Sequence, residues 1–297
     1  MRVSTSQLFT QGISSILDQQ SQAARSQMEL SSGKRILSPS DDPSGMKTVL
    51  DLGKAIDLTT QYQRNADSAQ ARLGIEDSTL SSATDLLQRA RELAVQGNNG
   101  SQTAESRKGI ATEVRQLVDG MLSLANTKDA NGEYLFAGYK TQQQPFSDNG
   151  AGGYTYSGDQ GQRTVQVGPS RQVATSDSGS GVFMNVPGSS QSVFGTLYKM
   201  ATDLEANTPT PATIDDIDAA IKNLANVRSR VGARLNAIDD QRNLNASNLL
   251  QFQQAKSSVE DVDVAKAVSD LQQHLTGLQA AQQSYVKIQG LSLFNYL

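Results

Sequence analysis

Residues 264–285 read VAKAVSDLQQHLTGLQAAQQSY, and this stretch decides the fold class. Its largely apolar stripe advances by alternating steps of four and three residues and comprises Val264, Val268, Leu271, Leu275, Leu278, Gln282 and Tyr285. Such spacing places the side chains on one face of a helix and is typical of a coiled coil. The stretch therefore predicts a helix that packs lengthwise against another helix.

A weaker stripe with the same spacing lies at the start of the chain. Its members are Phe9, Ile13, Ile16, Gln20, Ala23, Gln27 and Leu30. Residues 1–40 carry four basic and two acidic side chains, whereas residues 260–297 carry two basic and four acidic ones. We expect the two ends to pair with each other or with neighbouring copies. Because each end alone is a marginal helix, we expect both to be ordered only in an assembly.

Longer helices are predicted between the two ends. Asp42 and Pro43 suit the N-cap and first position of a helix, and the Gly97–Gly100 stretch ends the pattern, which gives a helix over 43–97. Further helices are expected over three ranges, namely about 103–128, 193–204, and from Pro211 to about residue 258.

Residues 130–190 are rich in Gly, Ser, Thr and Tyr and lack helical periodicity. The alternating segments 154–157 and 163–167 flank a Gly-containing turn and predict a β-hairpin. Further short strands are expected at 134–136 and at 182–183. Since Gly-rich segments bound this region, we expect a short linker to replace residues 140–185 without unfolding the helices.

Composition excludes several classes of function. Of the 297 residues only 37% are hydrophobic and 5% aromatic, which suits helices burying narrow stripes better than a deep rounded core. The net charge of −4 argues against a general nucleic-acid partner. The absence of cysteine excludes disulfides and thiolate metal sites, and the single histidine, His274, excludes a multi-histidine site. We predict no cofactor, no metal and no catalytic residues.

No stretch approaches the roughly 18 apolar residues of a membrane span, so a membrane partner is not expected. The N-terminus also lacks the apolar core of a signal peptide. Either the protein is cytoplasmic or it leaves the cell by a route without a cleaved signal.

Each of two acidic clusters can be interpreted either as a cation site or as part of a helix start. Asp41-Asp42 could hold a cation, but helix capping explains the pair. Glu260-Asp261-Val262-Asp263 resembles a piece of a calcium loop but lacks its glycine and distant glutamate, so we interpret it as a negatively charged helix start. His274 lies beside the stripe residue Leu275, and we expect it to pack rather than to act as a ligand or base.

These patterns predict a mainly α protein, an elongated helical bundle with terminal coiled-coil helices and a small β-rich insertion. Three domains are expected. Residues 1–40 and 260–297 form a terminal coiled-coil domain, residues 41–130 and 195–259 an inner helical bundle, and residues 131–194 an outer β-rich domain.

Several motifs resemble the flagellin superfamily. Leu30-Ser31-Ser32-Gly33-Lys34-Arg35-Ile36, followed by Ser38-Pro39-Ser40-Asp41-Asp42-Pro43, is similar to its N-terminal signature. The Lys-Arg-Ile and Pro-Ser-Asp-Asp-Pro forms are closer to the branch of hook-associated protein 3, the hook–filament junction proteins, than to flagellin. Further similar motifs are Asn131–Gly138, Val231–Asn236, Glu260–Ala265 and Leu291–Phe294.

The resemblance implies a structural protein of the bacterial flagellum that joins hook-associated protein 1 to the flagellin filament as a ring. It implies four partners besides further copies of the chain: hook-associated protein 1, flagellin, the flagellar type III export apparatus and an export chaperone. It also implies an extracellular location, reached without a cleaved signal peptide. Two alternatives stay open: a flagellin-like filament subunit, and a binding module or enzyme carried on the β insertion.

The assembly interface is predicted on the terminal helices. Its residues are Phe9, Ile13, Ile16, Ala23, Leu30, Val264, Val268, Leu271, Leu275, Leu278 and Tyr285.

Overall fold

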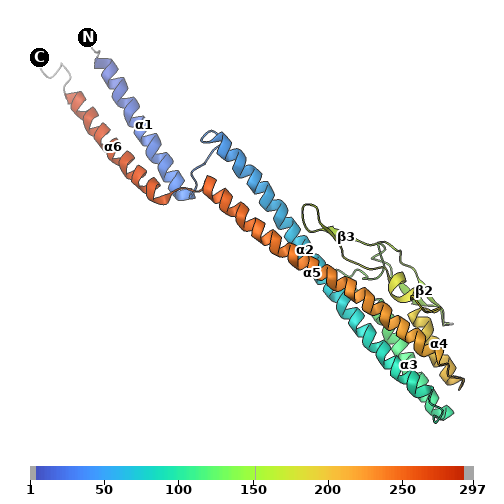
Figure 1. Ribbon diagram of the computed structural model, residues 1–297. Helices are drawn as coiled ribbons and strands as arrows, with labels where there is room; N and C mark the ends of the chain where they lie inside the picture. The colour runs from blue at the N-terminus through green and yellow to red at the C-terminus, as the bar shows by residue number, and fades with distance from the viewer. Residues whose placement is uncertain (1–4, 151, 291–297) are drawn as a thin grey trace, which may run out of the picture. The chain divides into compact units, whose positions relative to one another are not determined.

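The computed structural model describes residues 5–150 and 152–290. The chain divides into two compact units: the first comprises residues 1–58 and 248–297, and the second comprises residues 59–247. Within the first unit, helix α1 (Thr5–Ser32) runs beside helix α6 (Val264–Gly290), as Figure 1 shows. The expectation of a mainly α fold with a small β-rich insertion is confirmed.

Four further helices follow the predicted pattern closely. They are α2 (Pro43–Gly97), α3 (Ala104–Ala125), α4 (Val193–Glu205) and α5 (Ala212–Glu260). Side-chain caps fix two of the starts, because Thr103 accepts a hydrogen bond from the Ser106 amide and Ser192 accepts one from the Gly195 amide. Helix α3 ends three residues earlier than the predicted 128, since the Thr127 amide bonds to the Leu124 carbonyl and the Thr127 carbonyl accepts from the Leu135 amide instead of continuing the helix.

The predicted hairpin between 154–157 and 163–167 is wrong. Strand β2 (Tyr154–Tyr156) pairs with β1 (Phe146–Asp148), and β3 (Thr164–Gln166) pairs with β4 (Gln172–Ala174), both antiparallel. The segment between β2 and β3 is held elsewhere: the Asp159 carboxylate accepts hydrogen bonds from the Tyr139 and Gly161 amides. This contact turns the chain toward residue 139 and separates β2 from β3.

The two other expected strands are also different structures. Residues 134–136 contribute only an isolated bridge, between Lys128 and Tyr134. Val182 and Phe183 lie in η1 (Ser180–Met184), a π-helical turn, where both side chains are buried. Short apolar runs are ambiguous between strand and helix, and tertiary packing decides them.

The core of the second unit joins its helices to the strand-containing region. Phe136, Phe146, Phe183 and Phe194 are fully buried, and Phe146 lies 5.6 Å from Phe183 and 5.3 Å from Phe194 between ring centroids. Phe194 belongs to α4, so one aromatic cluster holds the insertion against a helix. This shared core argues against the expectation that a linker could replace residues 140–185. The three-domain boundaries stay a prediction.

Candidate assembly interface

Helices α1 and α6 form an antiparallel pair. Phe9 near the start of α1 meets Tyr285 near the end of α6, with ring centroids 5.9 Å apart in an edge-to-face arrangement. Further along, a Cβ placed on Gly277 would lie 2.9 Å from the side-chain oxygen of Gln19. The contacts thus move forward along α1 as they move backward along α6.

Small side chains occupy much of the face between the two helices, which we call the seam. On α1 it includes the buried or half-buried residues Phe9, Gly12, Ile16, Gln19, Ala23, Ser26 and Leu30. On α6 it includes Ala267, Leu271, His274, Gly277, Leu278, Ala281 and Tyr285, which are also buried or half-buried. A Cβ on Gly12 would lie only 3.1 Å from the Tyr285 ring, so glycine allows this close approach. His274 is half-buried in the seam, in keeping with the packing role expected for it.

The structure divides the predicted interface residues into two groups. Seven lie in the seam and are buried or half-buried: Phe9, Ile16, Ala23, Leu30, Leu271, Leu278 and Tyr285. Four lie outside the seam and are exposed: Ile13 (46%), Val264 (57%), Val268 (49%) and Leu275 (40%). The predicted α6 stripe therefore mixes two adjacent rows of the helix, and the structure does not bring Leu275 into the pair.

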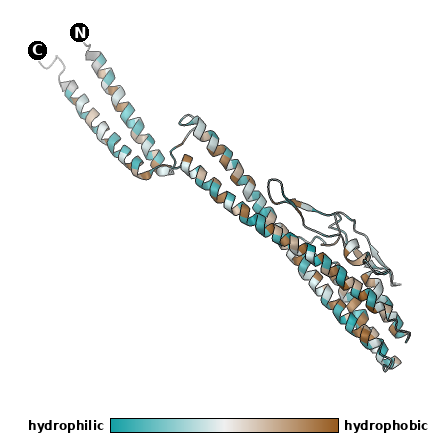
Figure 2. Cartoon of the chain, viewed as in Figure 1, coloured by the Kyte–Doolittle hydropathy of each residue, from teal (hydrophilic) through white to brown (hydrophobic). Residues whose placement is uncertain are grey.

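Three further exposed apolar residues on these helices were absent from the sequence prediction: Leu17, Met28 and Val286. Together with Ile13, Val264, Val268 and Leu275 they form what we call the outer residues. Figure 2 shows how both helices mix hydrophilic and hydrophobic residues along their length. Leu17 and Val286 could have been found in the sequence from their positions, because each directly follows a residue of the seam.

Beside the α1–α6 pair, a short two-stranded joint connects the chain segments. The Arg35 amide donates to the Glu260 carbonyl at 2.7 Å, and the Val262 amide donates to the Gly33 carbonyl at 3.0 Å. Lys34 adds an ion pair with Glu260 at 2.6 Å. The hydrogen bond that the Lys34 side chain donates to the Glu260 carboxylate raises the pKa of Lys34. The joint is built from the Gly33-Lys34-Arg35 motif and from the motif that starts at Glu260.

Both aspartates of the Asp41-Asp42 pair accept hydrogen bonds from backbone amides. Asp42 accepts from the Gly45 amide at 2.8 Å and so caps α2, as expected. Asp41 accepts from the Leu37 and Ser38 amides and pairs with Arg25 at 3.0 Å. These backbone hydrogen bonds lower the pKa of both aspartates.

The second acidic cluster differs from the expected helix start. Helix α5 ends at Glu260, and Asp261 lies in the joint. Only Asp263 acts at a helix start, because its carboxylate accepts from the Lys266 amide at 3.1 Å. Among the described residues, no group of three or more His, Cys, Asp or Glu side chains could hold a metal ion.

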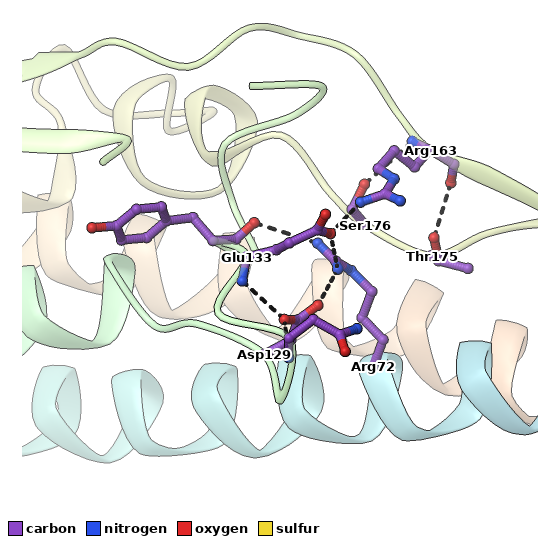
Figure 3. A network of polar contacts seen from close by, with 8 residues as sticks. Arg72, Asp129, Glu133, Arg163, Thr175 and Ser176 are labelled. Atoms are coloured by element: carbon purple, nitrogen blue, oxygen red, sulfur yellow. Dashed lines mark hydrogen bonds and ion pairs between the residues drawn. The ribbon is translucent and has the colours of Figure 1, made fainter. Parts of the chain in front are cut away.

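The second unit contains a partly buried ionic network around Arg72 of α2. Figure 3 shows the Arg72 side chain pointing between Asp129 and Glu133, and Arg163, the residue before β3, reaching Glu133. Arg72 also donates to the Tyr134 carbonyl at 3.3 Å. The charges are paired within the protein, so the arrangement ties the insertion to α2 and offers no free reactive group.

No helix in the described part of the chain is long and apolar enough to cross a membrane.

Two family models match the chain: the bacterial flagellin N-terminal helical region over residues 3–141, and the C-terminal helical region over residues 214–297. Flagellar hook-associated protein 3 of Escherichia coli is 31% identical, with 99% of each chain covered. The protein of the same name in Salmonella typhimurium is 30% identical, again with 99% of each chain covered. FlgL of Xanthomonas campestris has a crystal structure that superimposes with a TM-score of 0.63 at 25% identity, over 69% of this chain and 99% of that one.

These relatives are flagellar structural proteins, and the homology supports a structural role in the bacterial flagellum. No catalytic family is indicated among these matches. The chain belongs to the flagellar hook-associated protein 3 family of the flagellin superfamily.

Proposed function

We propose that this protein is the adaptor at the hook–filament junction. It assembles as a ring of identical chains between hook-associated protein 1 and the flagellin filament, and it is required for filament attachment and motility. It reaches this extracellular place through the flagellar type III export apparatus, with an export chaperone and without a cleaved signal peptide. Family membership supports this role.

The observation that carries the proposal is the row of apolar side chains left outside the α1–α6 seam. Ile13, Val268 and Leu275 are exposed on helices whose small seam residues already pair. Exposed apolar side chains at coiled-coil spacing are suited to a neighbouring helix. In the proposed ring, terminal helices of adjacent subunits cover these outer residues, and all eleven predicted interface residues contribute to the inter-helix contacts.

We also propose the three-domain division given by the sequence. In it the terminal domain makes the subunit contacts, the inner bundle supports it, and the outer domain faces solvent. The proposed role is mechanical, since the chain transmits force between two helical lattices through packed helices. It needs no cofactor and no nucleic-acid or membrane partner.

Deletion of the gene tests the proposal directly. Electron microscopy of the deletion strain should show hooks without filaments, and filament protein should accumulate in the medium. The wild-type gene should restore filaments, whereas a Leu275→Asp variant should not. A deletion strain that keeps normal filaments refutes the junction role.

A polymerisation assay distinguishes the proposed junction adaptor from the alternative, a filament subunit. The purified chain is mixed with filament fragments as seeds and followed by light scattering. A junction adaptor should not elongate the seeds. Growth of long fibres from this chain alone would favour the filament subunit instead.

A further inference from the structure

Glu76 is a buried carboxylic acid, and no neighbouring group donates a hydrogen bond to either of its oxygens. It lies on α2 in the second unit, and its exposed fraction is 1%. A buried carboxylate without donors is costly, because it loses the solvation of water and gains nothing in return. The charged groups around Glu76 therefore decide whether its carboxyl group is ionised or protonated.

Three charged groups from three parts of the fold surround Glu76: Asp177 from the segment between β4 and η1, Arg234 from α5, and Arg72 from α2 itself. Asp177 already has donors, since Arg234 lies 2.5 Å from one of its oxygens and the Gln162 amide donates to the other at 2.9 Å. Arg72 is directed to Asp129 and Glu133. Both arginines are thus engaged by other carboxylates.

The charges of this cluster balance only when Glu76 is neutral. Three arginines, Arg72, Arg163 and Arg234, pair with three carboxylates, Asp129, Glu133 and Asp177. An ionised Glu76 would add a seventh, uncompensated charge beside Asp177. A protonated Glu76 instead has an O–H group, which can donate to the Asp177 carboxylate.

We propose that Glu76 carries a proton at neutral pH and acts as a pH-sensitive latch, which holds residues 175–184 against α2 and α5 and loosens when the proton is lost. The segment is otherwise well packed: Asn223 of α5 donates to the Gly181 and Val182 carbonyls at 3.0 Å. Ionisation of Glu76 places two like charges together where the segment meets the helices. Burial, with the negative charge of Asp177, raises the pKa of Glu76 to about 8.

The sign of the pH dependence follows from linkage. The Glu76 carboxyl titrates near 4.5 in the unfolded chain and near 8 in the folded one. Between these values the unfolded chain releases the proton and the folded chain keeps it, so this group destabilises the fold increasingly as pH rises. Its contribution to the unfolding equilibrium constant grows about tenfold per pH unit and levels off above the folded-state pKa.

The test compares the full chain with Glu76→Gln and with a matched control, Glu113→Gln. Glutamine keeps the shape of a protonated glutamate, and Glu113 is an acid of the same unit whose side chain is 40% exposed and paired with Arg89. Urea unfolding is followed by circular dichroism from pH 5 to pH 9. The stability advantage of Glu76→Gln over wild type should grow with pH up to about 8, while Glu113→Gln follows wild type. A pH-independent difference between Glu76→Gln and wild type overturns the proposal.

Two further measurements on the wild-type protein keep the proposal falsifiable if Glu76→Gln does not fold. Carbon-13 NMR of glutamate carboxyl groups should show one group titrating near pH 8, and titration of every glutamate below pH 6 would overturn the protonated state. Amide exchange, corrected for its intrinsic pH dependence, should accelerate in residues 175–184 above pH 8. Unchanged corrected exchange there overturns the latch.

Discussion

Substitution by aspartate at two leucines on helical stripes should have different effects, on the stability of the monomer at one and on assembly at the other. Leu224 of α5 is fully buried in the core of the second unit, whereas Leu275 of α6 is 40% exposed. We compare Leu224→Asp with Leu275→Asp in the purified monomer and in the flagellum. The comparison separates a residue needed for the fold of the subunit from one needed for contacts between subunits.

The magnitudes follow from burial. Fully burying a leucine is worth roughly 1.5–3 kcal/mol. Leu224→Asp loses all of this and also places a charge in an apolar core, so it should cost about 4 kcal/mol or more. For a unit of this size the melting temperature should fall by about 10 °C or more. Leu275→Asp removes only part of the burial term, about 1–2 kcal/mol at most, and acts on the α1–α6 pair of the other unit.

Calorimetry of the monomers and electron microscopy of complemented deletion strains give the two readouts. Leu275→Asp should leave the main melting transition of the monomer in place and still abolish filament attachment. Leu224→Asp should lower that transition. If Leu275→Asp destabilises the monomer as much as Leu224→Asp does, the terminal helix belongs to the folded core and assembly-coupled ordering is wrong.

Three further predictions concern the helices and the joint. In the monomer, amides of residues 5–32 and 264–290 should exchange far faster than those of the second unit, because the seam residues that are buried rather than half-buried, Ala23, Ser26 and Ala267, are all small; strong protection in both segments at low protein concentration would contradict this. Gly74→Ala should raise stability by about 0.5–1 kcal/mol in thermal melts, since its added Cβ meets no atom within 4 Å, whereas Gly97→Ala should lower it because its Cβ would lie 2.5 Å from the buried Leu204 side chain. The Gly45 amide resonance should titrate with a midpoint below 3.8, because hydrogen bonding lowers the pKa of the Asp42 cap; the cap's stabilisation is present above 3.8 and lost as pH falls through the folded-state pKa, and a midpoint above 3.8 would refute this.

The helices were predictable because local chemistry marks their ends. Asp42 and Pro43 start α2, and Gly97 ends it, at the positions given by the sequence. Capping groups and breakers act within one turn of the chain, so they can be recognised without knowing the tertiary structure.

The strand pairings were not predictable, because each strand has only three residues and carries little pattern of its own. Hydrogen bonds from side chains in the loops decide which strands pair. Asp159 gathers the amides of Tyr139 and Gly161, and Asn126 exchanges two hydrogen bonds with the backbone of Phe146 at the start of β1. Asparagine and aspartate are common in turns, and nothing in their local sequence shows which distant amide they will bind. The buried Glu76 was missed for a similar reason, since its partner Asp177 lies about a hundred residues away.

The choice between the two rows of α6 was the part of the candidate interface that periodicity could not decide. Val268, Leu275 and Val286 each directly follow a seam residue and so lie about 100° around the helix from the seam. A count of large apolar residues does not separate the two rows, because Leu271, Leu278 and Tyr285 lie in the seam while Val268, Leu275 and Val286 lie outside it. The structure decides by geometry: alanine and glycine in the seam let the two helices approach closely, and only the row that faces the partner helix is covered. The second row of apolar residues therefore stays exposed in the single chain, and the proposed assembly covers it with a helix of a neighbouring subunit.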